Sequence, residues 1–163
     1  MNFKNPRDFL INIQKTKVNN VIDKSILDKI LEDRKNVLNL NILILLDVSG
    51  SISSSQYKQF MAQIDSIKGL SRVKVIEVDT DIVAMYDYFN MPSQRIIRLR
   101  GGGGTNFYTA FRKIKSMNPD AVLAMTDGEV SGSAENPLCP VGWILTKNGT
   151  KPYDFGEVLM NLE

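Results

Sequence analysis

The apolar run Ile42–Leu46 ("ILILL"), with the polar stretch "DVSGSIS" directly after it, constrains the fold of this 163-residue chain more than any other stretch. A short aliphatic run that ends at a carboxylate and a turn indicates a buried strand. Strands buried on both faces belong to sheets that helices cover on both sides. The run therefore predicts an α/β fold with a strand that ends at Asp47.

Strand and helix patterns alternate from residue 40 onward, which is typical of a mostly parallel sheet between two layers of helices. We predict helices at about residues 54–68 and 106–117, the second ending before Pro119 because proline cannot continue a helix. The predicted strands lie at about residues 41–47, 72–79, 82–89, 95–99, 120–126 and 140–146.

The pattern of the first 38 residues predicts helices. Asn5 and Pro6 have the types preferred at a helix cap and in a first turn. Apolar pairs recur at helical spacing between residues 21 and 31. We therefore divide the chain into a helical N-terminal extension, residues 1–38, and an α/β domain, residues 39–163. The extension either covers the sheet or docks a partner.

Composition excludes several classes of protein. The chain has no histidine, so it cannot hold a Ser-His-Asp triad or a HExxH zinc site. It has 20 basic and 18 acidic residues, a balance that does not favour nucleic acid or an anionic membrane as partner. A single cysteine, no signal-peptide pattern and no apolar run of about 20 residues lead us to expect a soluble, cytoplasmic protein without a membrane partner.

Polar residues follow the first predicted strand at alternate positions. Asp47, Ser49 and Ser51 occupy every second position, and a turn through Gly50 lets their side chains converge. One carboxylate and two hydroxyls form an all-oxygen set, which hard divalent cations such as Mg²⁺ prefer. Alternatively, Ser51 or Ser53 does no more than cap the next helix.

Two later loops carry side chains of the same kind. The buried stretch "AVLAM" leads to Thr126 and Asp127, and "GGGG" leads to Thr105 at the start of a predicted helix. Ligands of open α/β sheets bind beyond the carboxyl ends of strands, where the strand order reverses. If the strands before Asp47 and Asp127 are neighbours, both carboxylates reach this crevice. Each motif alone also fits a turn or a loop.

The order of these motifs resembles that of the von Willebrand factor A (VWA, integrin I-like) domains, whose metal-ion-dependent adhesion site (MIDAS) has the pattern DxSxS, then T, then D. Residues 40–163 resemble, more narrowly, the VWA-like domain at the C-terminus of metallopeptidase-like proteins of bacteria and phages. The matching stretches are "DVSGSIS", "GGGGTNF", "MTDGEV", "VGWILT" and "DFGEVLMNL". The positions that match the MIDAS pattern are Asp47, Ser49, Ser51, Thr105 and Asp127.

The resemblance implies a Rossmann-like, three-layer fold with a six-stranded, mostly parallel sheet and one antiparallel edge strand. It implies one Mg²⁺ or Mn²⁺, with Ser49 and Ser51 as direct ligands and Thr105 bound directly or through water. The two aspartates, Asp47 and Asp127, would act largely through waters and hydrogen bonds. Such an ion remains electrophilic and can take a carboxylate from a protein partner.

The implied function is therefore metal-dependent protein binding, without catalysis. Relatives are often encoded beside MoxR-type AAA+ ATPases, which makes such an ATPase a candidate partner. Longer relatives carry a peptidase-like region before this domain. Here only some 38 residues precede it and no histidine is present, so we expect no peptidase activity.

One enzymatic alternative remains open. Asp79, Asp81 and Val83 fit the DxDx(T/V) motif of haloacid-dehalogenase-like phosphatases, in which the first aspartate attacks phosphorus and the second acts as acid and base. The simpler interpretation is a solvated turn between two strands. Phosphatase assays of Asp79→Asn would separate the two.

Overall fold

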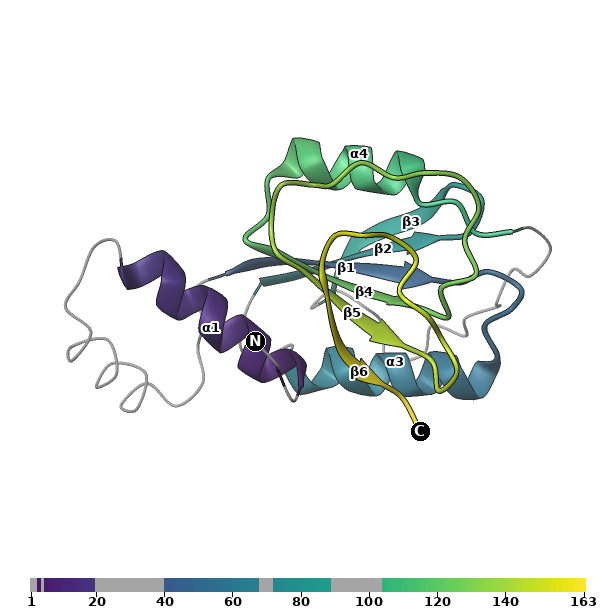
Figure 1. Ribbon diagram of the computed structural model, residues 1–163, viewed down its shortest axis with the longest axis horizontal. Helices are drawn as coiled ribbons and strands as arrows, with labels where there is room; N and C mark the ends of the chain where they lie inside the picture. The colour runs from purple at the N-terminus through teal and green to yellow at the C-terminus, as the bar shows by residue number, and fades with distance from the viewer. Residues whose placement is uncertain (1–2, 4, 20–39, 68–71, 89–103) are drawn as a thin grey trace.

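The computed structural model describes residues 3, 5–19, 40–67, 72–88 and 104–163, which form six strands and three helices (Figure 1). The helices are α1 (Pro6–Asn19), α3 (Ser54–Ile67) and α4 (Tyr108–Met117). The strands are β1 (Asn41–Asp47), β2 (Arg72–Val78), β3 (Ile82–Asp87), β4 (Ala121–Thr126), β5 (Val141–Leu145) and β6 (Glu157–Asn161).

The strands form one sheet in the order β3-β2-β1-β4-β5-β6. All neighbouring pairs are parallel except β2 and β3, which pair antiparallel at one edge. The predicted mostly parallel sheet with one antiparallel edge strand is confirmed. From β1 the chain builds outward through β2 and β3, and it then returns to the other side of β1 with β4. The strand order therefore reverses between β1 and β4, whose carboxyl ends carry Asp47 and Asp127.

The alternation of side chains along β1 divides the core between the two faces of the sheet. Ile42, Ile44 and Leu46 belong to one apolar cluster, together with Phe60 and Ile64 of α3. The spacing of four residues between Phe60 and Ile64 places both on the same side of that helix. Helices α1 and α3 cover this face of the sheet (Figure 1).

The opposite face of the sheet packs against α4 (Figure 1). Leu43 and Leu45 of β1 lie in a second apolar cluster with Phe111 of α4 and Trp143 of β5. Trp143 is fully buried, and its indole Nε1–H donates to the carbonyl of Phe155 at 3.0 Å. Two buried faces explain why β1 is aliphatic at every position from 42 to 46.

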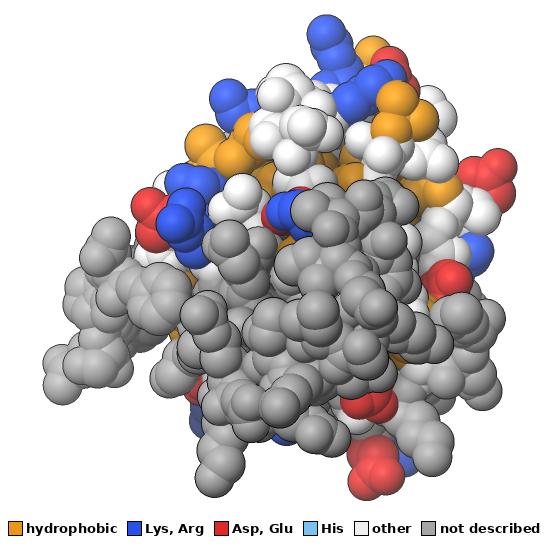
Figure 2. Space-filling view, turned by 90° about the vertical axis from the view of Figure 1, so that its left-hand side faces the viewer, with side chains coloured by type: hydrophobic (Ala, Val, Ile, Leu, Met, Phe, Trp, Pro, Cys, Tyr) orange, Lys and Arg blue, Asp and Glu red, His pale blue; other side chains and the backbone are white. Residues whose placement is uncertain are grey.

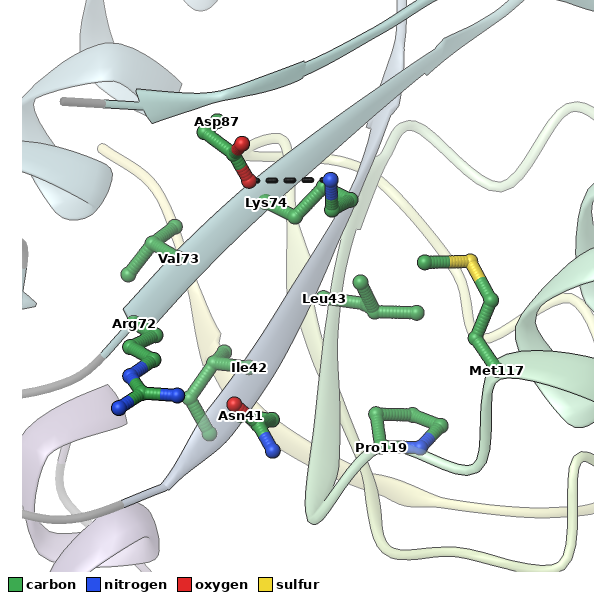
Figure 3. Close-up of a pocket in the computed structure, with 9 residues that line it drawn as sticks. All are labelled: Asn41, Ile42, Leu43, Arg72, Val73, Lys74, Asp87, Met117 and Pro119. Carbon is green, nitrogen blue, oxygen red and sulfur yellow. Dashed lines mark ion pairs between the residues drawn. The ribbon is translucent and has the colours of Figure 1, made fainter. Parts of the chain in front are cut away.

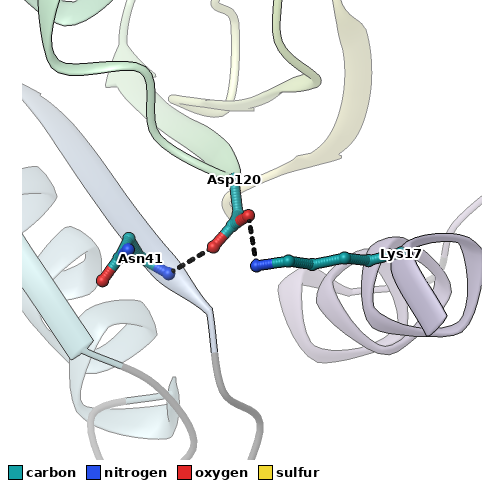
Figure 4. A network of polar contacts seen from close by, with 3 residues as sticks. All are labelled: Lys17, Asn41 and Asp120. Carbon is teal, nitrogen blue, oxygen red and sulfur yellow. Dashed lines mark hydrogen bonds and ion pairs between the residues drawn. The ribbon is translucent and has the colours of Figure 1, made fainter. Parts of the chain in front are cut away.

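Helix α1 begins as the sequence predicts and packs against the sheet. The side chain of Asn5 accepts a hydrogen bond from the backbone N–H of Asp8 at 2.9 Å, which caps the helix. At the other end, Lys17 Nζ lies 2.7 Å from Asp120 Oδ1, and Asp120 Oδ2 accepts from the backbone N–H of Asn41 at 2.8 Å (Figure 4). These contacts join α1 to the amino ends of β1 and β4.

Some expectations differ from the structure or lie outside it. Strand β6 is not among the predicted strands, because its apolar run is only three residues long and Leu159 is its one buried residue. Helix α4 begins at Tyr108, two residues later than expected. The predicted strand at 95–99 and the helical pattern after residue 19 lie outside the described residues. The division at residue 38 therefore stays a prediction.

The face of the molecule on the α1 side carries charges of both signs. In Figure 2, where described residues are visible, basic side chains gather toward the top of the view and acidic ones lie among and below them. Such mixing is consistent with the nearly balanced composition. No helix within the described ranges is long and apolar enough to cross a membrane.

Candidate functional site

The carboxyl group of Asp47 lies at the centre of the polar side chains at the carboxyl end of β1. Asp47 is fully buried. Its Oδ1 accepts a hydrogen bond from the backbone N–H of Ser49 at 2.9 Å and lies 3.4 Å from the hydroxyl of Thr105. Its Oδ2 accepts from the hydroxyl of Thr126 at 2.6 Å. Both oxygens are therefore engaged by the loops that surround them.

Thr126 also belongs to this polar group, although it is not one of the five residues that match the MIDAS pattern. It is the last residue of β4 and is fully buried. The register pairs Leu46 with Met125, so the next residue along each strand, Asp47 and Thr126, stand side by side. The backbone N–H of Gly128 donates to the Thr126 hydroxyl at 3.0 Å. The signal in the sequence was its position directly before Asp127.

The two serines follow Asp47 in a tight turn. The hydroxyl oxygens of Ser49 and Ser51 lie 3.2 Å apart. Ser49 is buried and Ser51 is exposed, so the pair runs from the interior to the surface. A further hydrogen bond, from the backbone N–H of Ile52 to the carbonyl of Ser49 at 3.1 Å, closes the turn before α3 begins. Ser51 does not cap α3, because Ser53 and Gln56 exchange the capping hydrogen bonds.

Asp127 lies one residue beyond β4 and is partly exposed. Its Oδ1 accepts a hydrogen bond from the backbone N–H of Glu129 at 2.9 Å. Within the described part of the chain its Oδ2 accepts no hydrogen bond. The condition that the strands of Asp47 and Asp127 be neighbours is met, since β1 pairs with β4. Of the five predicted residues, four are thus linked by hydrogen bonds, and Asp127 borders them.

Electrostatics distinguish the two aspartates. Burial raises the pKa of the Asp47 carboxyl above its ordinary value. Hydrogen bonds from Ser49 and Thr126 act in the opposite direction, while the negative charge of Asp127 adds to the increase. A cation beside Asp47 would offset the cost of keeping its charge in the interior.

The donor set suits a hard divalent cation. The residues present three hydroxyls and two carboxylates, all oxygen ligands of the type that Mg²⁺ and Mn²⁺ bind. Among the residues that the structure describes, no three histidine, cysteine, aspartate or glutamate side chains gather in a group that could hold a metal. A site at Asp47 does not need such a group, since three of its five side chains are hydroxyls.

We predict that Thr126→Val destabilises the protein by about 1–3 kcal/mol, because the buried Asp47 carboxyl loses its 2.6 Å partner at nearly constant side-chain volume. Urea unfolding in the presence of EDTA measures the change. Thr109→Val, at an exposed position on α4, is the matched control and should change stability by less than about 0.5 kcal/mol. Equal losses in both variants would show that Thr126 does not support Asp47.

The aspartates of the phosphatase alternative lie at the turn between β2 and β3. Oδ1 of Asp79 accepts hydrogen bonds from the backbone N–H groups of Thr80 and Asp81, and Oδ1 of Asp81 accepts from the N–H of Ile82 at 2.7 Å. These contacts are those of a turn stabilised by its own aspartates. They support the simpler interpretation.

A cavity of about 460 Å³ lies at the other end of the sheet (Figure 3). It is lined by the first residues of β1 and β2, among them Leu43 and Val73, by the ion pair of Lys74 and Asp87, and by Met117. Ligands of open α/β sheets bind at the carboxyl ends of the strands, so this cavity is not the predicted site.

Comparison with known proteins supports the assignment of the fold. A family model described as "VWA-like domain (DUF2201)" matches residues 42–162, which is most of the chain. The match begins with the buried strand before Asp47 and includes every residue of the candidate site. A search of curated proteins finds no match.

Proposed function

This chain belongs to the VWA-like domain family, and we propose that it is a metal-dependent protein-binding module whose ion site lies at the carboxyl ends of β1 and β4. The observation that supports this most is the convergence of Ser49, Thr105 and Thr126 on the buried carboxyl of Asp47. Three segments far apart in the sequence contribute to one polar group at the position where ligands of such sheets bind.

Burial divides the roles of the proposed ligands. Asp47 is fully buried, so it acts through its hydrogen bonds and its charge. Ser51 and Asp127 reach the surface and form the outer side of the site. Ser49 and Thr105 are buried beside Asp47. The chain thus offers few direct negative charges to Mg²⁺ or Mn²⁺, and the bound ion would supply an electrophilic centre for a carboxylate of a partner.

The proposed partner is a protein that offers an acidic side chain. By the family resemblance, a MoxR-type AAA+ ATPase is one candidate. The proposed location is the cytoplasm, in keeping with the single cysteine of the chain. Burial raises the pKa of the Cys139 thiol to about 11, so this thiol is a poor nucleophile. We propose binding rather than catalysis, because Asp79 and Asp81 stabilise their own turn.

We predict that Mn²⁺-loaded protein binds a carboxylate through the ion. Water-proton relaxation reports the exchangeable waters on bound Mn²⁺, so its enhancement should fall when a short peptide with one glutamate replaces a water. The same peptide with glutamine is the control and should leave the enhancement unchanged. Equal effects of the two peptides would contradict the proposed mode of binding.

A phosphatase assay tests the enzymatic alternative. With p-nitrophenyl phosphate and Mg²⁺, we expect the wild type to show no more hydrolysis than Asp79→Asn does. Turnover by the wild type that is lost in Asp79→Asn would overturn the assignment as a binding module.

A further inference from the structure

The loop that follows β4 returns across the loop that carries Thr105. The backbone N–H of Ser131 donates to the carbonyl oxygen of Thr105 at 2.7 Å, and the Ser131 hydroxyl donates to the same oxygen at 3.1 Å. Thr105 and Val130 form an isolated parallel β-bridge. The segment that begins with Asp127 is thereby joined to the backbone of another proposed ligand.

The peptide group between Thr105 and Asn106 is held at both ends. Its carbonyl oxygen accepts the two hydrogen bonds from Ser131, and its N–H donates to the carbonyl oxygen of Asp79 at 2.8 Å. A peptide group is planar, so contacts at both ends fix its orientation. The Cα of Thr105 lies in the plane of this group, so the same contacts fix the position of the atom from which its side chain branches.

Thr105 is buried, and within the described residues its hydroxyl makes one hydrogen bond to the site. The hydrogen bond from its hydroxyl to Asp47 Oδ1 is long, at 3.4 Å. In the sequence it follows four glycines, which have the widest backbone freedom of any residue. A methyl group on Gly104 would meet nothing within 4 Å. The contacts from Ser131 and Asp79 therefore contribute to the position of Thr105.

We propose that Ser131 is a positioning residue of the metal site, acting through Thr105. Its hydroxyl and its N–H hold the Thr105 carbonyl, so that the hydroxyl of Thr105 is already oriented before an ion binds. This inference rests on the proposed metal-binding function. It assigns a role to an exposed serine outside the DxSxS, T and D positions.

Mn²⁺ titration by electron paramagnetic resonance tests the proposal with three variants. Ser131→Ala removes one of the two hydrogen bonds and should weaken Mn²⁺ binding about threefold to tenfold. Ser131→Thr keeps the hydroxyl and should restore the affinity. Ser133→Ala, at an exposed serine two residues on, is the matched control and should bind as the wild type does.

A double-mutant cycle shows whether Ser131 acts through Thr105. In a Thr105→Val background, where the proposed ligand is absent, Ser131→Ala should have no further effect on Mn²⁺ affinity. A readout without metal is hydrogen exchange of the Asn106 amide, which belongs to the held peptide group. Its exchange should be faster in Ser131→Ala than in Ser133→Ala.

The outcomes separate this inference from the proposed function. If the wild type binds Mn²⁺ and Ser131→Ala binds it as tightly as Ser133→Ala does, the positioning role is wrong and the metal site stands. If Ser131→Ala weakens binding equally with and without Thr105, the serine does not act through that residue and the proposal is overturned. If the wild type binds no Mn²⁺, both proposals fail.

Discussion

Gly128→Ala should destabilise the protein by about 3 kcal/mol, the largest loss we expect from a single methyl group at this site. Gly128 has a φ of +84°, a conformation that alanine adopts only with strain. A Cβ at this position would lie 1.8 Å from the carbonyl oxygen of Thr150. The backbone N–H of Thr150 also donates to the carbonyl of Asp127 at 3.1 Å. The segment that carries Thr150 therefore has little freedom to move away from Gly128.

Thermal or urea unfolding measures this loss, which corresponds to a decrease in Tm of about 6–12 °C for a domain of this size. Gly104→Ala is the control, because a Cβ there meets nothing within 4 Å. Both variants add one methyl group to a loop of the candidate site. Similar stabilities of the two would refute the close approach of Thr150 to Gly128.

Asp47→Asn should abolish metal binding, and the metal-free variant should gain stability relative to the wild type as the pH rises from 4 to 8. Burial raises the pKa of the Asp47 carboxyl in the folded chain. A carboxyl group whose pKa is higher in the folded chain than in the unfolded chain stabilises the fold at pH values below its pKa in the unfolded chain, about 3.9. This contribution is lost as the pH rises through the pKa of the folded chain. Asparagine avoids that loss because it carries no charge.

Urea unfolding of metal-free protein from pH 4 to pH 8 tests this. The difference between Asp47→Asn and the wild type should be small at pH 4 and should grow with pH. Asp154→Asn removes a charge at an exposed position and is the matched control. A stability of Asp47→Asn below that of the wild type at every pH would show that the carboxylate supports the fold rather than the site.

The fold could be predicted to the extent that burial leaves a pattern in the sequence. Strand β1 is apolar at each position from 42 to 46 because helices cover both faces of the sheet, and this made it visible. Strand β6 is an edge strand with Leu159 as its buried residue, and it left no such pattern. Its place beside β5 is determined by tertiary pairing, which local sequence does not record.

The candidate site was predictable where spacing within one loop determines the geometry, as for Asp47, Ser49 and Ser51. The site also requires β1 and β4 to be neighbours, and the sequence alone does not show which strands pair. The contacts of Thr126 and Ser131 depend on strand register and on the return of a loop, and both join residues more than 20 positions apart. No periodicity in the sequence indicates such contacts.

The central claim is that the carboxyl ends of β1 and β4 hold one divalent ion. Mn²⁺ titration by electron paramagnetic resonance, with Mg²⁺ as competitor, tests it on the wild type and on Asp47→Asn. We expect the wild type to bind about one Mn²⁺ that Mg²⁺ displaces, as an all-oxygen site would, and we expect Asp47→Asn to bind none. Absence of Mn²⁺ binding by the wild type, or equal binding by both proteins, would contradict the claim.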